Sequence, residues 1–286
     1  MCGIIGSFEA HRGDGPAWRP DELARMTAAR DTMVPRGPDG CGLWHDRRAL
    51  LGHRRLSILD LSDAAAQPMT GASGATLVFN GEIYNYVELR TELRRAGVEV
   101  ASTGDSAVLI AAYERWGLSD TLARLRGMYA FAIWDPRSGE LHLVRDPVGK
   151  KPLYVASYQA SDHGDAPAGL VFASSVGALR AWHPGGRDLR VDPIAVEQFL
   201  VGGYIPAPRT IYVGVEKLQA GTWMTVDSHG RRRGGQHYTM PLGERTERLT
   251  AGSLDHLGSL LRTAVERRLR SDVPVATFLS GGLDSS

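Results

Sequence analysis

One stretch of the sequence constrains the fold more than any other, because it predicts an antiparallel β-hairpin. Apolar side chains alternate over residues 128–134, an Asp-Pro-Arg-Ser-Gly turn occupies residues 135–139, and the alternation returns over residues 141–144. Short alternating runs joined by such a turn are typical of a hairpin. Residues 153–158 and 170–173 predict a second pair of strands. Hairpins that follow one another along the chain argue against a purely parallel βαβ sheet, so we expect a mixed α+β fold.

Further strands and helices are predicted around these hairpins. Short apolar runs predict strands, and apolar residues at helical spacing predict helices. The strands are expected at residues 2–8, 50–59 and 75–79, and the helices at residues 21–33, 86–96 and 105–116. Gly97 and Gly117 would close the last two helices. Residues 35–40, rich in Pro and Gly, predict a loop, and residues 206–208 and 230–235 predict less regular order.

The sequence pattern near the end of the chain indicates the start of a second structural unit. A charged segment at residues 242–250 resembles an interdomain linker, residues 254–269 keep helical apolar spacing, and residues 273–279 predict a buried strand. That strand runs directly into Ser-Gly-Gly-Leu-Asp-Ser-Ser at residues 280–286. Glycines and small hydroxyls before a helix form an anion cradle, which suits the pyrophosphate of a nucleotide. The loop lacks the lysine of a Walker A motif.

Charge and cysteine content argue against several classes of function. The net charge is +1, with 33 basic and 32 acidic residues, so there is no electrostatic reason to expect nucleic acid or a membrane as partner. Two cysteines cannot form a disulfide framework, and no segment has the Cys and His spacing of a metal site. The N-terminus holds no apolar secretion signal, and no run approaches the roughly 20 apolar residues of a membrane span. We therefore expect a cytoplasmic protein without a metal site.

The second residue carries the most specific chemistry. Removal of Met1 would leave Cys2 with a thiol and a free α-amino group on the same residue. An α-amino group titrates near pH ~8 and a cysteine thiol near ~8.5, so this amine can act as general base for its own side chain. Taken alone, Cys2 could also be just a small second residue without a catalytic role.

Asn80 and Gly81 follow a predicted strand and form a natural pair of hydrogen-bond donors. A side-chain amide and a glycine N–H that point at one atom can stabilise an oxyanion, and losing one such donor typically costs about 2.7–4 kcal/mol of transition-state stabilisation. The alternative is an ordinary Asn-Gly turn between a strand and a helix.

Two charged residues are candidates for binding the charged groups of a small substrate. Arg55 lies in a strand-like run and could hold a carboxylate bidentately, whereas Arg54 should point to the opposite face, toward solvent. Asp105 opens a helix, where it could serve as an N-cap or as partner of a substrate ammonium group, and the sequence leaves both roles open. His53 is more typical of a packing histidine than of a catalytic base.

Five motifs together resemble those of the glutamine-dependent asparagine synthetases. They are Met-Cys-Gly-Ile at residues 1–4, Arg-Gly-Pro-Asp-Gly at 36–40, His-Arg-Arg-Leu-Ser-Ile at 53–58, Phe-Asn-Gly-Glu-Ile-Tyr-Asn at 79–85 and Arg-Asp-Pro-Val-Gly at 145–149. The resemblance implies a class II glutamine amidotransferase domain at residues 2–218, folded as the four-layer αββα sandwich of two antiparallel sheets found in N-terminal-nucleophile hydrolases. It also implies a connecting segment at residues 219–252. Residues 253–286 would then begin an α/β parallel-sheet nucleotide-binding domain, the ATP-dependent synthetase domain.

Residue by residue, the resemblance assigns a glutamine site. Cys2 is then the nucleophile with its own amine as base, and Asn80 and Gly81 form the oxyanion hole. The residues that would bind glutamine are Arg55, Leu56, Ser57, Ile58, Leu59, Asn80, Gly81, Glu82 and Asp105.

Within that set the resemblance separates two charge contacts. Arg55 would bind the glutamine α-carboxylate, and Glu82 and Asp105 would engage the α-amino group. A second set would surround the ATP pyrophosphate in the other domain. Its members are Leu279, Ser280, Gly281, Gly282, Asp284, Ser285 and Ser286.

The implied reaction starts with attack of Cys2 on the glutamine carboxamide, followed by release of ammonia and hydrolysis of the thioester to glutamate. In the intact family enzyme, aspartate is adenylylated with ATP and Mg²⁺, and ammonia converts it to asparagine with release of AMP and pyrophosphate. The glutaminase half needs no cofactor. The expected partners are glutamine, and in the intact enzyme aspartate and ATP, with a homodimer left open. Two alternatives remain, an amidotransferase of a related ATP-dependent amidating ligase with another carboxylate substrate and a non-catalytic interaction module.

Overall fold

The computed structural model describes residues 1–286 apart from residues 11–17, 160–167, 184–188, 242, 244–249 and 284–286. The predicted linker at residues 242–250 therefore lies almost wholly outside the described residues. The same holds for the last three residues of the predicted pyrophosphate loop, Asp284, Ser285 and Ser286.

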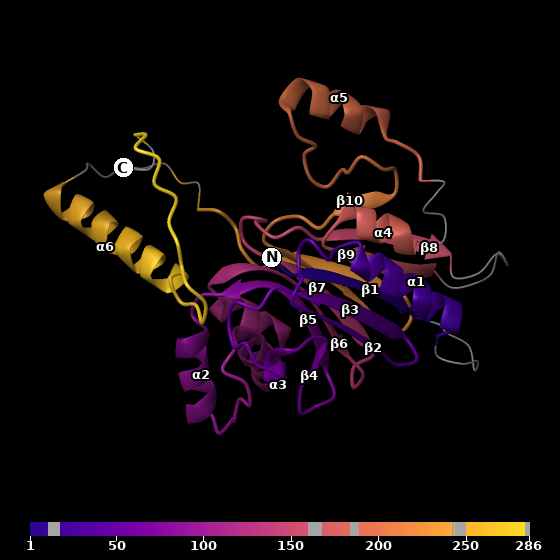
Figure 1. The fold of residues 1–286 in the computed structure, drawn as a ribbon, viewed down its shortest axis with the longest axis horizontal. Coiled ribbons are helices and arrows are strands. Elements are labelled where there is room, and N and C mark those ends of the chain that lie inside the picture. The colour runs from indigo at the N-terminus through magenta and orange to yellow at the C-terminus, as the bar shows by residue number, and fades with distance from the viewer. Residues whose placement is uncertain (11–17, 160–167, 184–188, 242, 244–249, 284–286) are drawn as a thin grey trace.

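Two six-stranded sheets form the centre of the molecule (Figure 1). The first sheet has the spatial order β10-β8-β9-β1-β3-β2, and its strands are β1 (Gly3–Glu9), β2 (Gly40–His45), β3 (Ala49–Arg55), β8 (Tyr154–Gln159), β9 (Ala168–Ala173) and β10 (Val215–Lys217). The second has the order β12-β11-β7-β6-β5-β4, and its strands are β4 (Met69–Thr70), β5 (Thr76–Ile83), β6 (Gly127–Asp135), β7 (Glu140–Arg145), β11 (Thr222–Val226) and β12 (Arg232–Gln236). The strand pairings among the described residues are antiparallel.

The hairpin predicted from alternation consists of β6 and β7. Its register pairs Asp135 with Glu140, and Gly139 in the turn has φ +66°. This left-handed conformation favours glycine, because glycine has no Cβ to clash with the backbone. The second predicted pair forms β8 and β9, which are also antiparallel. Both hairpin predictions are confirmed.

Helices cover the outer face of each sheet, so the layers follow the order α, β, β, α (Figure 1). The helices on the first sheet are α1 (Pro20–Asp31) and α4 (Val176–Trp182), and those on the second are α2 (Tyr86–Arg95) and α3 (Asp105–Arg124). This arrangement confirms the predicted αββα sandwich.

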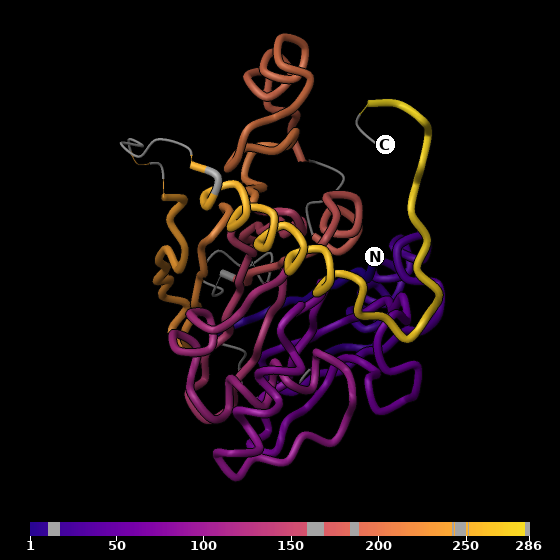
Figure 2. Tube along the Cα trace, turned by 90° about the vertical axis from the view of Figure 1, so that its left-hand side faces the viewer, coloured from indigo at the N-terminus to yellow at the C-terminus, as the bar shows by residue number. Residues whose placement is uncertain are grey.

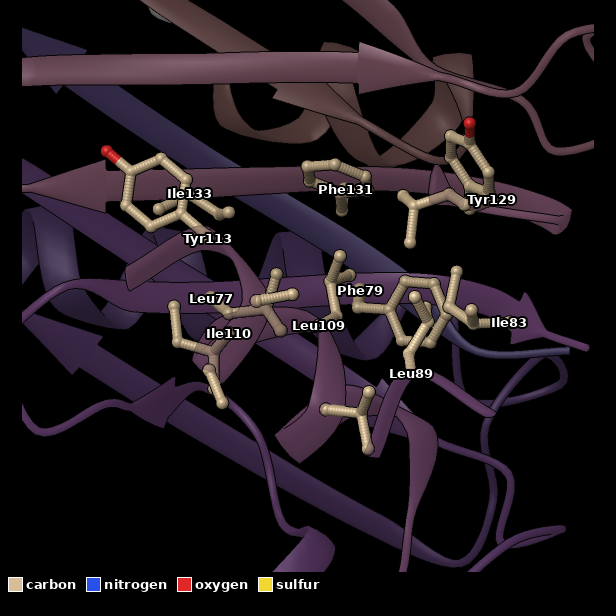
Figure 3. Close-up of a cluster of buried hydrophobic side chains, with 14 of the residues drawn as sticks. Leu77, Phe79, Ile83, Leu89, Leu109, Ile110, Tyr113, Tyr129, Phe131 and Ile133 are labelled. Atoms are coloured by element: carbon tan, nitrogen blue, oxygen red, sulfur yellow. The ribbon is translucent and has the colours of Figure 1, made fainter. Parts of the chain in front are cut away.

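Apolar clusters between the layers hold the sandwich together. Figure 3 shows the cluster under the second sheet, where Phe79 of β5 and Phe131 of β6 lie over Leu109 of α3. A separate cluster fills the space between the sheets and includes Leu51 of β3 and Leu143 of β7, both fully buried. Each fully buried side chain of this size stabilises the fold by about 1.5–3 kcal/mol. The two sheets are therefore firmly fixed against each other, which matters for a cavity built from both.

The predicted helices are found close to their expected bounds. α1 has Pro20 in its first turn, and the Glu22 carboxylate accepts the N–H of Arg19 at 2.7 Å, which satisfies a backbone donor that the helix leaves free. Gly117, predicted to end the third helix, has φ +74° and ψ 176° and does interrupt it, but α3 continues beyond Gly117 to Arg124.

Two predictions near the end of the chain are wrong. Residues 273–279 form no strand, and Phe278 and Leu279 are 102% and 75% exposed. A buried strand needs neighbouring strands for its backbone hydrogen bonds, and none of the described residues pairs with this segment. Residues 230–235, predicted as less regular, lie largely in β12, which pairs with β11. Residues 222–236, which the sequence placed in a connecting segment, thus contribute two strands to the second sheet.

Two further helices lie outside the sandwich. α5 (Pro193–Gly202) projects from the body of the molecule, and α6 (Ala251–Arg268) brings the chain back beside α2 (Figure 1). In Figure 2 the chain after α6, drawn in yellow, meets the N-terminal part of the chain, where it is hydrogen-bonded to Asp60. Within the described part of the chain, no helix combines the length and apolar character needed to cross a lipid bilayer.

Candidate active site

A cavity of about 280 Å³ opens where β1, the loop after β3 and β5 meet. This volume lies just below the usual range for ligand sites, about 300–1,000 Å³, and suits a small molecule. The residues that line it are Met1, Cys2, Arg55, Leu56, Ile58, Leu59, Ala65, Gln67, Phe79, Asn80, Gly81, Glu82, Asp105, Ser106, Met128 and Lys151. The structure thus brings together every residue predicted for the glutamine site except Ser57, whose N–H donates to Asp39 at 2.8 Å.

Cys2 lies at the entrance to β1 and is held through both its backbone and its sulfur. The Nε of Arg36 donates to the carbonyl of Cys2 at 3.1 Å, and the N–H of Leu56 lies 3.4 Å from Sγ. Burial raises the pKa of the Cys2 thiol, and the hydrogen bond from Leu56 opposes this effect. A thiol with a raised pKa needs a base close by to become a nucleophile. Burial also lowers the pKa of the terminal amine, carried here by Met1, which favours the neutral form that a base requires.

The loop that follows β3 forms one wall of the cavity. β3 ends at Arg55, so the predicted strand through Leu59 is wrong over its last four residues. Beyond Arg55 neither neighbouring strand offers a partner, since β1 pairs only as far as Arg54 and the pairing with β2 stops at Arg55. The N–H of Leu56 bonds the Cys2 sulfur instead of a strand. This loss of strand pairing is what leaves the loop free to line a ligand site.

Asp60 fixes the far end of this loop. It adopts φ +49°, a left-handed conformation that Asp tolerates better than most residues. Its carboxylate accepts hydrogen bonds from Ser62, from the hydroxyl of Ser102 and from the N–H of Thr103. These bonds, with that from Ser102 the largest, hold the pKa of Asp60 well below its usual range. The Arg55 guanidinium donates to the carbonyls of Asp60 and Ser62, so Asp60 also positions Arg55.

Asn80 and Gly81 lie next to each other on β5 and both line the cavity. Asn80 is fully buried; its Nδ2 lies 3.4 Å from Ser174 Oγ, and its Oδ1 has no partner among the described residues. Ser174 Oγ also accepts the N–H of Ile4 on β1, at 3.1 Å. At Gly81 a Cβ would lie 2.3 Å from the carbonyl oxygen of Met128, so no other residue fits without moving the backbone.

Glu82 and Asp105 place two carboxyl groups beside the cavity. Burial, reinforced by repulsion from Asp105, raises the pKa of Glu82 to about 7. Burial also raises the pKa of Asp105 to about 6, although the N–H of Ile83 donates to its carboxylate at 2.9 Å. Asp105 begins α3, so it is at the same time a residue of the first helical turn and a lining residue. A cationic group between the two carboxyl groups would favour their ionised forms.

Lys151 is a cavity residue that the sequence reasoning missed. It is 5% exposed, and its burial lowers the pKa of the ammonium group. The preceding motif explains its placement: Asp146 accepts the N–H groups of Lys150 and Lys151, at 2.9 and 2.8 Å, and Arg145 donates to the carbonyl of Lys151 at 2.8 Å. The signal was its position two residues after the Arg-Asp-Pro-Val-Gly motif.

The other two basic residues of the β3 motif have structural roles. His53 is fully buried and its Nε2 lies 3.2 Å from the carbonyl of Phe79, which links the two sheets. Burial lowers the pKa of His53 to about 3, so it stays neutral, as expected of a packing histidine. Arg54 does point away from Arg55, but not into solvent as predicted. Its side chain is 11% exposed and lies 3.5 Å from Asp31.

The predicted pyrophosphate loop is described only as far as Leu283 and is not part of the cavity. Gly281 has φ +71°, and no atom of the described residues outside its immediate neighbours lies within 4 Å of the place where a Cβ would stand. The N–H of Gly282 lies 3.4 Å from Ser280 Oγ. A left-handed glycine with open space around it fits the approach of a phosphate group to the backbone.

Comparisons with known proteins identify the family of the chain. The sequence profile of the glutamine amidotransferase domain matches residues 1–239, and that of asparagine synthase matches residues 256–286. The chain is 34% identical over 299 residues to a putative glutamine-hydrolysing asparagine synthetase of Mycobacterium tuberculosis, covering 100% of this chain and 45% of that protein. It is 33% identical over 290 residues to glutamine-hydrolysing asparagine synthetase 1 of Bacillus subtilis, covering 100% and 43%. The chain thus spans less than half the length of these curated relatives.

A solved structure shares the fold. Glutamine phosphoribosylpyrophosphate amidotransferase from B. subtilis, in complex with ADP and GMP, superposes with a TM-score of 0.55 at 19% identity, over 84% of this chain and 50% of that one. The profile match extends over most of the chain and includes the residues that line the cavity. The chain is an enzyme that belongs to the family of glutamine amidotransferase domains.

Proposed function

We propose that this chain hydrolyses glutamine, with Cys2 as the nucleophile and the α-amino group of the same residue as the base. The observation that carries the proposal is that one cavity brings Cys2 together with one arginine, two carboxyl groups and an Asn-Gly pair. These groups match the charges of a free amino acid and the needs of acyl transfer. Met1 itself lines the cavity, so its removal would both create the base and widen the site.

The first step is attack of Cys2 Sγ on the side-chain carboxamide of glutamine. The neutral α-amine accepts the thiol proton and passes it to the leaving ammonia, and a thioester forms. Water then attacks the thioester, the amine again accepts a proton, and glutamate leaves as the thiol is restored. Leu56, whose N–H lies 3.4 Å from Sγ, orients the sulfur through both half-reactions.

The oxyanion of each tetrahedral intermediate would be held by the amide of Asn80 and the N–H of Gly81. In the structure the Asn80 amide donates to Ser174 and leaves Oδ1 without a partner among the described residues. Rotation of the amide would exchange its two ends. The Ser174 hydroxyl would then donate to Oδ1, and Nδ2 would be free to donate to the oxyanion.

The other charged residues that line the cavity are assigned to the two charged groups of glutamine. Arg55 is oriented by the carbonyls of Asp60 and Ser62 and would bind the α-carboxylate. Glu82 and Asp105 would engage the α-ammonium group. Ammonium binding requires these carboxyl groups to be ionised, which gives the site a pH dependence.

For the intact protein we propose glutamine-dependent asparagine synthesis, with ATP and aspartate as the other substrates. The support is the asparagine synthase profile over residues 256–286 and the similarity to relatives named as glutamine-hydrolysing asparagine synthetases. Ser280, Gly281 and Gly282 would hold phosphate groups of the nucleotide, and Mg²⁺ would accompany it. The domain boundary then falls after β12, between residues 239 and 256, since β11 and β12 belong to the second sheet. A free thiol nucleophile would require a reducing compartment, which supports the cytoplasm.

The proposal is tested with the purified chain and L-glutamine. We expect ammonia and glutamate in equal amounts, without ATP, from protein whose intact mass shows that Met1 is absent. D-glutamine, which presents its α-groups in mirror image, is the control and should not react. A chain that lacks Met1 but releases no ammonia from L-glutamine contradicts the proposal.

Glutamine binding is expected to weaken as the pH falls. The pKa values of Glu82 and Asp105 are about 7 and about 6, so acidification through this range neutralises both carboxyl groups and removes their attraction for the ammonium group. Calorimetric titration of the Cys2→Ala variant with glutamine should show a Kd about tenfold higher near pH ~5.5 than near pH ~8. The Glu82→Gln variant should lose most of this dependence near neutrality. A Kd that is constant over this range would contradict the assignment.

A further inference from the structure

The segment that follows α6 is hydrogen-bonded to the wall of the proposed glutamine site. The N–H of Asp272 donates to the carbonyl of Ile58 at 3.0 Å, and the N–H of Asp60 donates to Asp272 Oδ2 at 2.7 Å. Two bonds of opposite direction thus join one residue to both ends of the stretch 58–60. Ile58 and Leu59 of that stretch line the cavity.

The same segment is anchored a second time, on the other side of the cavity. The Arg270 guanidinium donates to the carbonyl of Tyr84 at 2.7 Å and to both carboxylate oxygens of Glu88, at 2.7 and 2.8 Å. These bonds from Arg270 lower the pKa of Glu88 to about 2. The Arg268 guanidinium lies over the Tyr84 ring, 4.5 Å from its centroid. Residues 268–272 therefore bridge the loop after β3 and the end of β5, the two chain segments that carry most of the site.

Asp60 links the contact with Asp272 to the position of Arg55. Its carboxylate is used by Ser62, Ser102 and Thr103, and its carbonyl accepts from Arg55. The remaining backbone group of Asp60 is its N–H, which donates a hydrogen bond to the Asp272 carboxylate. Asp60 is buried and has a left-handed backbone conformation. Loss of the Asp272 acceptor would therefore leave the N–H of Asp60 without a hydrogen bond, at the residue that orients Arg55.

We propose that Asp272 is a positioning residue of the glutamine site, supplied by the part of the chain that matches the asparagine synthase profile. Asp272 holds the Ile58–Asp60 loop, and through Asp60 it keeps Arg55 in place for the substrate carboxylate. Glutamine affinity then depends on the docking of a segment that lies outside the amidotransferase profile. This inference rests on the proposed function, because it concerns the same site.

The test compares variants of the whole chain in glutamine hydrolysis. Asp272→Ala should raise the KM for glutamine about tenfold and leave kcat within about twofold, because it disturbs substrate binding and not the reacting groups. Asp272→Asn should raise KM less, since its side-chain oxygen still accepts the N–H of Asp60. The matched control is Asp255→Asn on the exposed face of α6, which should leave both constants unchanged.

Hydrogen exchange of the backbone gives a second readout that does not need activity. Residues 56–62 should exchange faster in Asp272→Ala than in the wild type, while residues of β6 (Gly127–Asp135) keep their protection and show that the fold is intact. A raised KM together with faster loop exchange supports the proposal. An unchanged KM, or a loss confined to kcat, overturns it. A wild-type chain without glutaminase activity would contradict the proposed function instead, and the exchange rates alone would then show whether Asp272 holds the loop.

Discussion

Cys2→Ala is expected to abolish glutamine hydrolysis, with a loss of about 10⁴-fold or more in kcat. The variant keeps the α-amine at residue 2 but removes the sulfur, so no thioester can form; loss of a nucleophile in a catalytic unit commonly costs this much. Ammonia release from L-glutamine measures the effect. Calorimetry should show that the variant still binds glutamine, because Arg55, Glu82 and Asp105 are untouched.

The chain offers a matched control for this change. Cys41 is the other free cysteine; it is exposed and does not line the cavity. Cys41→Ala should keep wild-type kcat and KM. Substantial ammonia release by Cys2→Ala, with its intact mass verified, would remove Cys2 from the mechanism.

Asn80→Ala should have the second largest effect, a fall of about 10²–10³-fold in kcat with little change in KM. The amide acts on the oxyanion, which exists only after attack, so its loss weakens the transition state and not the bound substrate. Steady-state ammonia release measures both constants. Because Asn80 is fully buried, Asn80→Asp is a second variant of nearly the same shape that lacks the amide donor. It should show a loss of similar size.

Asn85→Ala is the control for Asn80. Asn85 bonds the carbonyl of Arg124 and the N–H of Arg126, at 3.0 and 2.9 Å, and does not line the cavity. Its loss should lower the melting temperature by a few degrees at most and leave kcat close to that of the wild type. If Asn80→Ala kept kcat within about twofold of the wild type, the oxyanion assignment would be wrong.

Local patterns predicted the elements whose conformation depends on neighbours in sequence. The alternation around residues 135–139 defined the β6 and β7 hairpin, and Gly117 marked the interruption of α3. Where pairing depends on distant strands, local patterns failed. The predicted strand through Leu59 continued past the end of the pairing with both neighbouring strands, and residues 273–279 have no strand partner among the described residues.

The reacting residues of the site were easier to identify in the sequence than the residues that hold them in place. Cys2, Arg55 and Asn80 stand out because their side chains carry functional groups, and they line one cavity in the structure. Asp60 has no distinguishing signal in the sequence, and Lys151 is marked only by its position two residues after the Arg-Asp-Pro-Val-Gly motif. The role of Asp60 comes from its burial and from hydrogen bonds to Ser102 and Thr103, 42 and 43 positions away, and the role of Lys151 comes from its burial in the cavity wall.

The sequence by itself determined the types of reacting group, and it indicated the β6–β7 and β8–β9 hairpins and the helices α1, α2 and α3, because residue chemistry and backbone preference are local properties. Only the tertiary structure decided that these groups meet. Two antiparallel sheets pressed together bring the start of β1 against β5, and the loop after β3 is held by Asp60 and by Asp272, 212 positions later. Such convergence depends on long-range packing and backbone hydrogen bonding, which no short window of residues encodes.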